Sequence, residues 1–473
     1  MLCSPTVFLV GGWNAENRKL CSGLQMSVTY SQIKEVTQPE AMAAFLAAQV
    51  IQPVLPAVQV KKVKTKEGRR FEAPRILWNV YEAQLELPGG IESRALFWTK
   101  AFFRDDDCEA YRHRIEPTLS SQNGNPLDPR GHARFFPDLN LFLFLFPTDP
   151  IFPALPTVYD GDSVRPILEP TWQHLRPEAR VGSVTPVRVK YLPEISCIIR
   201  YEGDLGEERP LNVYGKVQHS RRGKLTYDVM KALWDLPARA SGELVLSEPL
   251  AYHPKYDLLL QSEVLGEEIE GDRGSDVFLA QCEAAGRTIG HIHSSGITAG
   301  TPHTVDVEID RLLNRLEEFK MSSPTVYLAL RDLLKQISAK ADRVPPEAPV
   351  PSHGDYKYNQ FLYDGTHFGL IDVEYFVQAE PSFDLGKYCG HLAPSVPKDW
   401  SDTAVAAEAR RIFLDAYLAV CPDYLGARFP LYEALSLATR ALVVTWSQSR
   451  NWEYTARTLI ALAYERLKTR WGE

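Results

Sequence analysis

The spacing of apolar residues changes along the chain, from a period of two in the first half to a helical period in the second. Alternating apolar and polar residues predict half-buried strands in residues 55–87, 93–103, 187–203 and 211–217, with a further strand after Tyr256. The apolar run at residues 139–146 predicts a buried strand. Helical spacing predicts helices in residues 38–50, 105–115, 222–235 and 275–295, two helices in 304–341, and three more in 402–420, 431–449 and 454–471.

These elements divide the 473 residues into five regions, which is enough chain for two or three folding units. Residues 1–25 are expected to be a disordered or untranslated extension, because the second methionine begins a more ordinary start. Residues 26–150 form an α+β region, and residues 151–186 a Pro-rich connector with little regular structure. Residues 187–265 are expected to form a β-rich lobe, and residues 266–473 a mostly helical lobe. The predicted fold class is α+β.

Composition restricts the possible partners and the compartment. A net charge of −8 argues against nonspecific binding of nucleic acid. The seven cysteines are scattered without a C-x-x-C pair, which is typical of reduced thiols in a cytoplasmic protein. No apolar run approaches the length of a membrane helix. We therefore expect a cytoplasmic protein that acts on a small molecule and has no nucleic-acid or membrane partner.

Residues 351–392 carry the strongest chemical signal in the sequence. The segment begins with His353-Gly354-Asp355, has Gln360 five residues after the aspartate, and reaches Asp372 beyond a turn at Asp364-Gly365. The apolar flanks of that turn predict two short paired strands. Such a hairpin would bring the carboxylates and the amide together at one end of a rigid support. It supplies a carboxylate to receive a proton and oxygen ligands for a hard cation.

This segment resembles the catalytic segment of the aminoglycoside phosphotransferase and choline kinase-like family, which are small-molecule kinases. The family pattern is H-x-D, four residues, Asn, and then a metal-binding Asp. Gln360 stands where asparagine is usual, and Asn359 is the alternative ligand one place earlier. The residues Pro381–Leu385, PSFDL, resemble the end of the family's G-x-P-x-x-D-L pattern, and the usual glycine before the proline is absent. The resemblance implies a protein-kinase-like fold with a β-rich small lobe and a helical large lobe.

The resemblance also implies a role for each residue of the segment. Asp355 would accept or orient the proton of the substrate hydroxyl. Gln360 and Asp372 would hold Mg²⁺, which bridges the phosphates of ATP.

Three further residues lie near this predicted site. His353 would brace the loop without taking part in the chemistry. Asp384 would be a structural aspartate whose carboxylate accepts backbone hydrogen bonds around the loop. Glu374 is either a second metal contact or an anion on the substrate side, and the sequence leaves both possibilities open.

The β-rich lobe supplies candidates for binding the nucleotide. Lys216 on its third strand can bridge two phosphates of ATP. The helix that follows lacks the usual glutamate partner of this lysine, and Asp228 is the nearest substitute. Gln261, Glu263 and Val264 lie where the family joins its two lobes, so their backbone groups could pair with the adenine edge.

An N-terminal lysine offers a second, weaker parallel. The order strand, strand with Lys100, helix with Glu109, and strands matches a kinase small lobe, so residues 26–150 could be a degenerate copy of that lobe. They could also be a substrate-side β-rich extension that merely shares an element order common to many α+β domains. We favour the second interpretation, in which Lys100 is an ordinary surface lysine.

The leading functional prediction is an ATP- and Mg²⁺-dependent phosphotransferase that acts on a hydroxyl of a small molecule. One alternative is a catalytically weak nucleotide-binding pseudokinase or scaffold, favoured by the Gln for Asn exchange and the missing helix glutamate. Transfer of AMP to protein is a third possibility that no residue favours. The substrate classes that the resemblance allows are sugars, amino alcohols, aminoglycosides and macrolides.

Overall fold

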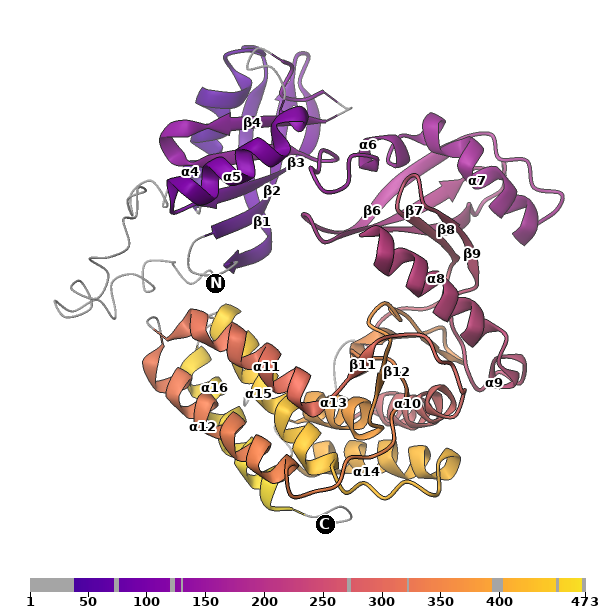
Figure 1. Ribbon diagram of the computed structural model, residues 1–473. Helices are drawn as coiled ribbons and strands as arrows, with labels where there is room; N and C mark the ends of the chain where they lie inside the picture. Colours follow the sequence, from indigo (N-terminus) through magenta and orange to yellow (C-terminus); the bar gives the residue numbers. More distant parts are fainter. Residues whose placement is uncertain are drawn as a thin grey trace. The chain divides into compact units, whose positions relative to one another are not determined.

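The computed structural model describes residues 38–71, 76–119, 124–128, 131–269, 274–320, 323–393, 403–447 and 451–469. The chain divides into two compact units, whose elements are labelled in Figure 1. The first holds the described residues up to Arg209 with Val217–His219 and Lys255–Asp257, and the second holds Pro210–Lys216, Ser220–Pro254 and the residues from Leu258 onward. Helices and strands occur in both units, which confirms the α+β class. The predicted extension, residues 1–25, lies outside the described residues.

A five-stranded antiparallel sheet forms the centre of the first unit. Its strands have the order β1-β2-β3-β5-β4 and are β1 (Gln59–Phe71), β2 (Ile76–Leu87), β3 (Ile91–Phe102), β4 (His132–Phe136) and β5 (Leu141–Leu145). Helix α4 (Pro39–Phe45) and the π-helical turn η1 (Leu46–Ile51) cover the sheet, with Met42 and Leu46 in one cluster with Tyr81 and Phe97. The predicted buried strand is confirmed as β5, in which every residue is buried, and β2 and β3 also contain continuous buried runs.

The prediction of little regular structure in residues 151–186 is wrong. Helices α6 (Leu155–Val158) and α7 (Gly161–Leu175) lie there, and the Asp160 carboxylate caps α7 by accepting from the Ser163 backbone N–H at 2.9 Å. Val164, Leu168 and Trp172 are buried at helical spacing, whereas Pro166 and Pro170 lie on the exposed side of the helix. The proline content hid this amphipathic pattern. The helix tolerates both prolines because each removes a backbone hydrogen bond only on the solvent side.

Lys100 is not a surface residue, so the interpretation that we favoured for it is wrong. Only 5% of Lys100 is exposed, and its ammonium forms an ion pair with the carboxylate of Glu194. Glu194 lies in the turn between β6 (Val184–Leu192) and β7 (Ser196–Gly203), which pair antiparallel. Glu109, on α5 (Asp105–Ile115), pairs instead with Arg112 at 2.8 Å.

Aromatic and polar groups surround this buried ion pair. The Tyr111 hydroxyl donates to the Glu194 carboxylate at 2.9 Å, and the Tyr111 ring lies 4.8 Å from the Lys100 ammonium. Asp149 accepts from the Glu194 backbone N–H and from the Tyr191 hydroxyl, both at 2.8 Å. The turn of the β6–β7 hairpin is thus fixed within the first unit by charge-assisted hydrogen bonds.

The second unit begins with the element order strand, helix, two antiparallel strands. These are β8 (Leu211–Gln218), α8 (Ser220–Trp234), the short α9 (Pro237–Ala240), β9 (Pro249–His253) and β10 (Leu258–Ser262). β9 and β10 pair antiparallel, with Leu259 opposite Tyr252. The first unit has the same order in β3, α5, β4 and β5, and a lysine lies on β8 as on β3.

Two groups of packed helices make up most of the second unit. Helices α10 (Asp276–His293) and α14 (Thr403–Val420) pack closely at Gly286, where a Cβ would come within 2.2 Å of the Phe413 carbonyl oxygen. The other group consists of α11 (Val305–Leu316), α12 (Pro324–Ala341), α15 (Phe429–Ser447) and α16 (Trp452–Lys468) (Figure 1). Within the described ranges no helix is long and apolar enough to span a bilayer.

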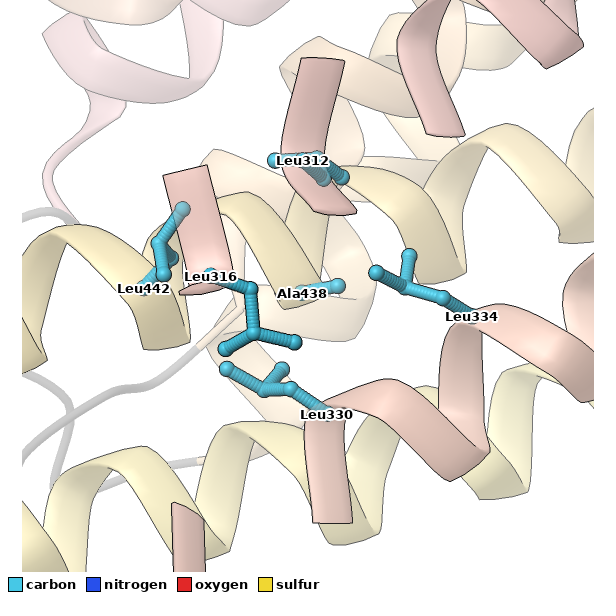
Figure 2. Close-up of a pocket in the computed structure, with 6 residues that line it drawn as sticks. All are labelled: Leu312, Leu316, Leu330, Leu334, Ala438 and Leu442. Carbon is cyan, nitrogen blue, oxygen red and sulfur yellow. The ribbon is translucent and has the colours of Figure 1, made fainter. Parts of the chain in front are cut away.

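Leucine side chains from three helices meet in an apolar gap inside this second group. Figure 2 shows leucines of α11 and α12 directed toward α15, and the lining consists of Leu312, Leu316, Leu330, Leu334, Ala438 and Leu442. The gap has no room for a water molecule. It is therefore part of the packed core, and the polar chemistry of the unit lies elsewhere.

The predicted hairpin is confirmed as β13 (Phe361–Tyr363) and β14 (Phe368–Leu370), with Phe361 opposite Leu370. A three-stranded sheet lies next to it in the order β11-β15-β12, made of Pro302–His303, Val377–Ala379 and Val350–Ser352. Helix α13 (Ser382–Leu392) follows directly. Short 3₁₀ turns complete the described elements: η3 (Glu116–Thr118), η4 (Pro137–Leu139), η5 (Glu317–Phe319) and η6 (Tyr358–Gln360).

The buried pair predicts a large effect of removing one charge. Glu194→Gln leaves the Lys100 ammonium buried without this carboxylate, and we expect the free energy of unfolding to fall by about 3 kcal/mol. The double variant Lys100→Met, Glu194→Gln should recover part of this loss because no unbalanced charge remains at the site. Urea unfolding of the three proteins measures the difference. Glu109→Gln, at the exposed pair, is the control and should change stability by less than about 1 kcal/mol; an equal effect at both sites would contradict the prediction.

Candidate active site

The loop after β12 has a backbone shape that requires glycine. Gly354 has φ +86°, in the left-handed region, and a Cβ at this position would lie 1.9 Å from the Tyr375 carbonyl oxygen. A side chain would therefore clash with backbone, and the left-handed conformation would add strain. The glycine of the His353-Gly354-Asp355 motif lets the loop turn tightly against the segment that follows Asp372.

Asp384 holds this loop from the first turn of α13. Its carboxylate accepts from the backbone N–H groups of His353 at 2.6 Å and Gly354 at 2.9 Å, and it is fully buried. His293 of α10 lies 3.4 Å from the same carboxylate. Burial alone would raise the pKa of Asp384, but the hydrogen bonds and charges around it, His293 above all, lower the pKa more. The carboxylate thus stays ionised and supplies two acceptors to the loop.

His353 lies inside the loop and is completely buried. Its Nδ1 accepts from the Asp355 backbone N–H at 3.4 Å, which is a long hydrogen bond. Burial lowers the pKa of His353, so the ring is neutral at pH 7. These contacts place it as a support of the loop.

Asp355 projects from the loop between two lysines. Its Oδ2 lies 2.9 Å from the Lys357 ammonium and 3.4 Å from the Gln360 amide nitrogen, while its Oδ1 lies 3.6 Å from the Lys387 ammonium. About 27% of the Asp355 side chain is exposed, so a substrate can reach it. Two ammonium groups therefore flank this carboxylate, one near each of its oxygens.

The structure distinguishes between the two candidate amides. Gln360 is only 4% exposed and its side chain turns toward the loop, where its oxygen accepts from the Lys357 backbone N–H at 3.2 Å. Asn359 is exposed. The backbone carbonyl oxygen of Gln360 accepts from the Ile371 backbone N–H at 2.9 Å. This hydrogen bond ties the loop to the residue before Asp372. Gln360 is therefore the amide on the inner side of the site.

Lys216 lies between two carboxylates. Its ammonium is 2.7 Å from an oxygen of Asp372 and 2.7 Å from an oxygen of Glu374. Burial lowers the pKa of Lys216, but the two carboxylates raise it more, so the net shift is upward. Burial raises the pKa of Glu374, against the lowering effect of Lys216. Asp372 itself has φ +70°, a strained conformation for a residue with a side chain.

Asp228 does not partner Lys216, contrary to the sequence prediction. Its carboxylate pairs with Lys224 at 2.6 Å, one turn earlier on α8, and both side chains are at least half exposed. Asp228 lies on the solvent face of α8, so it cannot reach the buried ammonium. Lys216 takes its anions from the segment after β14 instead.

The predicted hinge residues lie close to β8 and the catalytic hairpin. The Glu263 carboxylate accepts from the Asn212 amide at 3.2 Å and from the Tyr214 hydroxyl at 3.3 Å. Gln261 donates to the Ser247 hydroxyl at 3.3 Å. Val264 packs on β14, where a Cβ at Gly369 would come within 2.3 Å of its Cγ1. These contacts involve side chains, so the backbone groups of Glu263 and Val264 are not used by them.

The sequence analysis missed three residues of this site. Lys357 lies two residues after Asp355, inside the motif that was recognised, so its position was available from the sequence. Tyr214 precedes Lys216 by two residues and therefore shares its strand face, a signal of period two. Lys387 had no such signal, because its contact with the loop depends on how α13 packs.

The residues that could hold Mg²⁺ are the oxygen donors Gln360, Asp372 and Glu374. These are the hard ligands that Mg²⁺ prefers. In the part of the chain that the structure describes, no cluster of three or more His, Cys, Asp or Glu side chains forms a closed metal site. A bound Mg²⁺ would therefore complete its shell with water and phosphate oxygens, as Mg²⁺ does in nucleotide sites. The donor set fits the ion on these terms.

Residues 226–430 match the family model described as the phosphotransferase enzyme family. This segment contains Asp355, Gln360, Asp372 and Asp384, and it begins after Lys216. The match confirms the resemblance inferred from the motifs. The chain has no match among curated proteins.

Several solved structures resemble part of this chain. A putative aminoglycoside phosphotransferase from Ralstonia eutropha JMP134 has 15% identity and a TM-score of 0.48, covering 64% of this chain and 98% of its own. Choline kinase from Cryptosporidium parvum Iowa II has 14% identity and a TM-score of 0.44, covering 62% and 91%. Choline kinase from Streptococcus pneumoniae has 14% identity and a TM-score of 0.41, covering 64% and 98%.

A second charged cluster lies at the start of α11 within the phosphotransferase-like segment. Glu308 is 2% exposed and is held by His303 at 3.1 Å and by Arg311 at 2.5 Å. Burial would raise the pKa of Glu308, but the His303 hydrogen bond and the Arg311 and Lys387 charges lower it to about 2. This carboxylate therefore stabilises the fold while it is ionised.

Acid should remove this stabilisation. The folded pKa of Glu308 is about 2, below the ordinary value of 4.5, so its contribution is complete above pH 4.5 and is lost as the pH falls toward 2. The difference corresponds to about 3 kcal/mol. We expect Glu308→Gln to unfold more easily than the natural protein at pH 7, with the gap narrowing between pH 5 and pH 3. Urea unfolding across this range measures it, and Glu453→Gln on an exposed part of α16 is the control. A gap that does not change with pH would contradict the assignment.

Proposed function

We propose that the protein is an ATP- and Mg²⁺-dependent phosphotransferase that transfers the γ-phosphoryl group to a hydroxyl of a small molecule. One observation carries the proposal: Lys216 meets Asp372 and Glu374 at 2.7 Å, and Asp355 lies on the loop tied to the residue just before Asp372. A cation for phosphates, oxygen donors for a metal and a carboxylate for a proton are the three parts that phosphoryl transfer requires. The family match over residues 226–430 supports the same reaction class.

Each residue has a distinct task in this proposal. Lys216 would exchange the carboxylates for the phosphate oxygens of the nucleotide, to which a flexible ammonium is well suited. Asp372, Gln360 and Glu374 would hold the metal. When bound, Mg²⁺ supplies charge neutralisation at the phosphate oxygens. Asp355 accepts the proton of the acceptor hydroxyl.

The nucleotide base would lie toward the hinge and β8. Asn212, Tyr214 and Lys216 alternate along β8 and so share one face, which Lys216 shows to be the face toward the site. Tyr214 offers an aromatic surface for a base on that face. The backbone groups of Glu263 and Val264 offer the donor and acceptor for its edge.

The acceptor is a small molecule with a hydroxyl group, and the substrate classes are those that the resemblance allows. We propose a cytoplasmic location, because Cys108, Cys197, Cys282, Cys389 and Cys421 are free thiols that suit a reducing compartment.

Nucleotide binding can be tested without knowledge of the acceptor. A ligand that binds only the folded protein adds about 2.7 kcal/mol at a concentration one hundred times its Kd. We expect ATP with Mg²⁺ to raise the thermal midpoint, and Asp372→Ala to abolish most of that rise. Asp228→Ala is the matched control and should keep the rise, because Asp228 pairs with Lys224 on the exposed face of α8. No stabilisation by any nucleotide would contradict the proposal and favour a scaffold.

The proton acceptor can be separated from the metal site. Asp355→Asn keeps the shape of the side chain but removes its basicity, so we expect ATP with Mg²⁺ to stabilise the variant as it does the natural protein. Transfer to an acceptor found by screening sugars, amino alcohols and aminoglycosides for ADP release should fall at least about one hundredfold. Full transfer by Asp355→Asn would rule out the base role.

A further inference from the structure

Lys387 is a buried lysine that the family pattern does not account for. It lies on α13, three residues after Asp384, and only 9% of it is exposed. Its ammonium donates to the Gly354 carbonyl oxygen at 2.6 Å, lies 3.6 Å from Asp355 Oδ1, and lies 4.9 Å from the centre of the Phe383 ring. The first two contacts are with the loop that carries Asp355, whereas Phe383 lies on α13 itself.

Filling space does not explain this residue. Burying an ammonium is unfavourable unless nearby groups compensate, and a methionine of similar length would fill the same volume without that penalty. The compensation comes from the Gly354 carbonyl and from the carboxylate of Asp355, with Glu308 contributing charge at longer range. The positive charge is therefore tied to the residue that is proposed to accept the proton.

Helix α13 holds both sides of Gly354. Asp384 accepts from the Gly354 N–H at 2.9 Å, and Lys387 donates to the Gly354 C=O at 2.6 Å. Residues three apart lie on the same face of a helix, so one helical turn fixes the two peptide groups that flank the glycine. The peptide between Gly354 and Asp355 sets the direction of the Asp355 side chain.

The two oxygens of Asp355 have different neighbours. Oδ2 is held by Lys357 at 2.9 Å and approached by Gln360 at 3.4 Å. Oδ1 has Lys387 at 3.6 Å, which is beyond hydrogen-bond distance but within range of strong charge attraction. Oδ1 is therefore the oxygen with hydrogen-bonding capacity available to an incoming hydroxyl.

We propose that Lys387 is a positioning residue that directs Asp355 Oδ1 toward the acceptor hydroxyl; this rests on the proposed phosphotransferase function. In the reaction the acceptor O–H bond breaks and its proton passes to Asp355 Oδ1. The acceptor oxygen forms a bond to the γ-phosphorus while the bond from that phosphorus to the bridging oxygen breaks and ADP leaves. Lys387 touches Asp355 and Gly354 and does not touch the substrate.

The test uses ATP and Mg²⁺ with water as the acceptor, and repeats the measurement with any acceptor found by screening. Lys387→Met should lower the rate of ADP release at saturating ATP by at least about tenfold. It should leave the KM for ATP and the thermal stabilisation by ATP with Mg²⁺ unchanged, because the nucleotide contacts lie at Lys216 and Asp372. Lys340→Met is the matched control. Lys340 lies on α12 and donates to the Leu467 carbonyl of α16, so this variant should keep full activity.

Chemical rescue separates charge from packing. Lys387→Ala leaves a space the size of propylammonium, and adding that cation should restore part of the rate, whereas propan-1-ol of the same size should not. Equal rescue by propan-1-ol, or full activity of Lys387→Met, would show that Lys387 only fills space and would overturn the proposal while leaving the function intact. If the natural protein releases no ADP and gains no stability from ATP with Mg²⁺, the proposed function itself fails, and the positioning role fails with it.

Discussion

The buried carboxylate of Asp384 fixes the geometry on which the candidate site depends. It satisfies two consecutive backbone N–H groups, those of His353 and Gly354, at a bend where the chain cannot form regular hydrogen bonds. Two donors turned toward one carboxylate define the direction of the following peptide, and Asp355 projects from that peptide. Without this buried acceptor the backbone N–H groups of His353 and Gly354 would be unsatisfied. The left-handed conformation of Gly354 would then lose the hydrogen bond that stabilises it.

Positive and negative side chains alternate at the site: one lysine lies between two carboxylates, and one aspartate lies between two lysines. Lys216 lies between Asp372 and Glu374, and Asp355 lies between Lys357 and Lys387. Each buried charge is thereby compensated in the absence of nucleotide, which limits the desolvation penalty of the unliganded protein. In the proposed function, phosphates and Mg²⁺ carry the charges that would replace these partners. The proposed function is thus compatible with a stable unliganded fold.

The sequence predicted what is local and missed what depends on packing. The hairpin and the inner position of Gln360 follow from spacings of a few residues, which the backbone converts directly into geometry. The partners of Lys216 could not be found in this way, because Asp372 lies 156 residues further along the chain and Glu374 lies beyond it. Asp228 was chosen for its closeness in sequence, although helical spacing places it on the exposed face of α8.

Prolines hid the helix at residues 161–175, and here a signal was present but was not used. Val164, Leu168 and Trp172 have helical spacing, and both internal prolines lie on the opposite side. Lys387 is different, because no pattern distinguishes a buried lysine from an exposed one when its helix is covered on nearly every side. Only the packing of α13 against the loop shows why an ammonium is present.

Lys100 and Lys216 show how one element order supports two outcomes. Each lies on a strand followed by a helix and two antiparallel strands, and each ammonium is buried against carboxylate. Lys216 faces two acidic residues of the segment after β14, and in the proposed function a nucleotide competes with them for its ammonium. Lys100 is enclosed by Glu194 and by the ring of Tyr111, whose hydroxyl also binds Glu194. Displacing Glu194 would break its bonds to Lys100 and Tyr111 together, and its backbone N–H is held separately by Asp149. The lysine of the first unit is therefore committed to structure, whereas the proposed function requires the lysine of the second unit to exchange its partners.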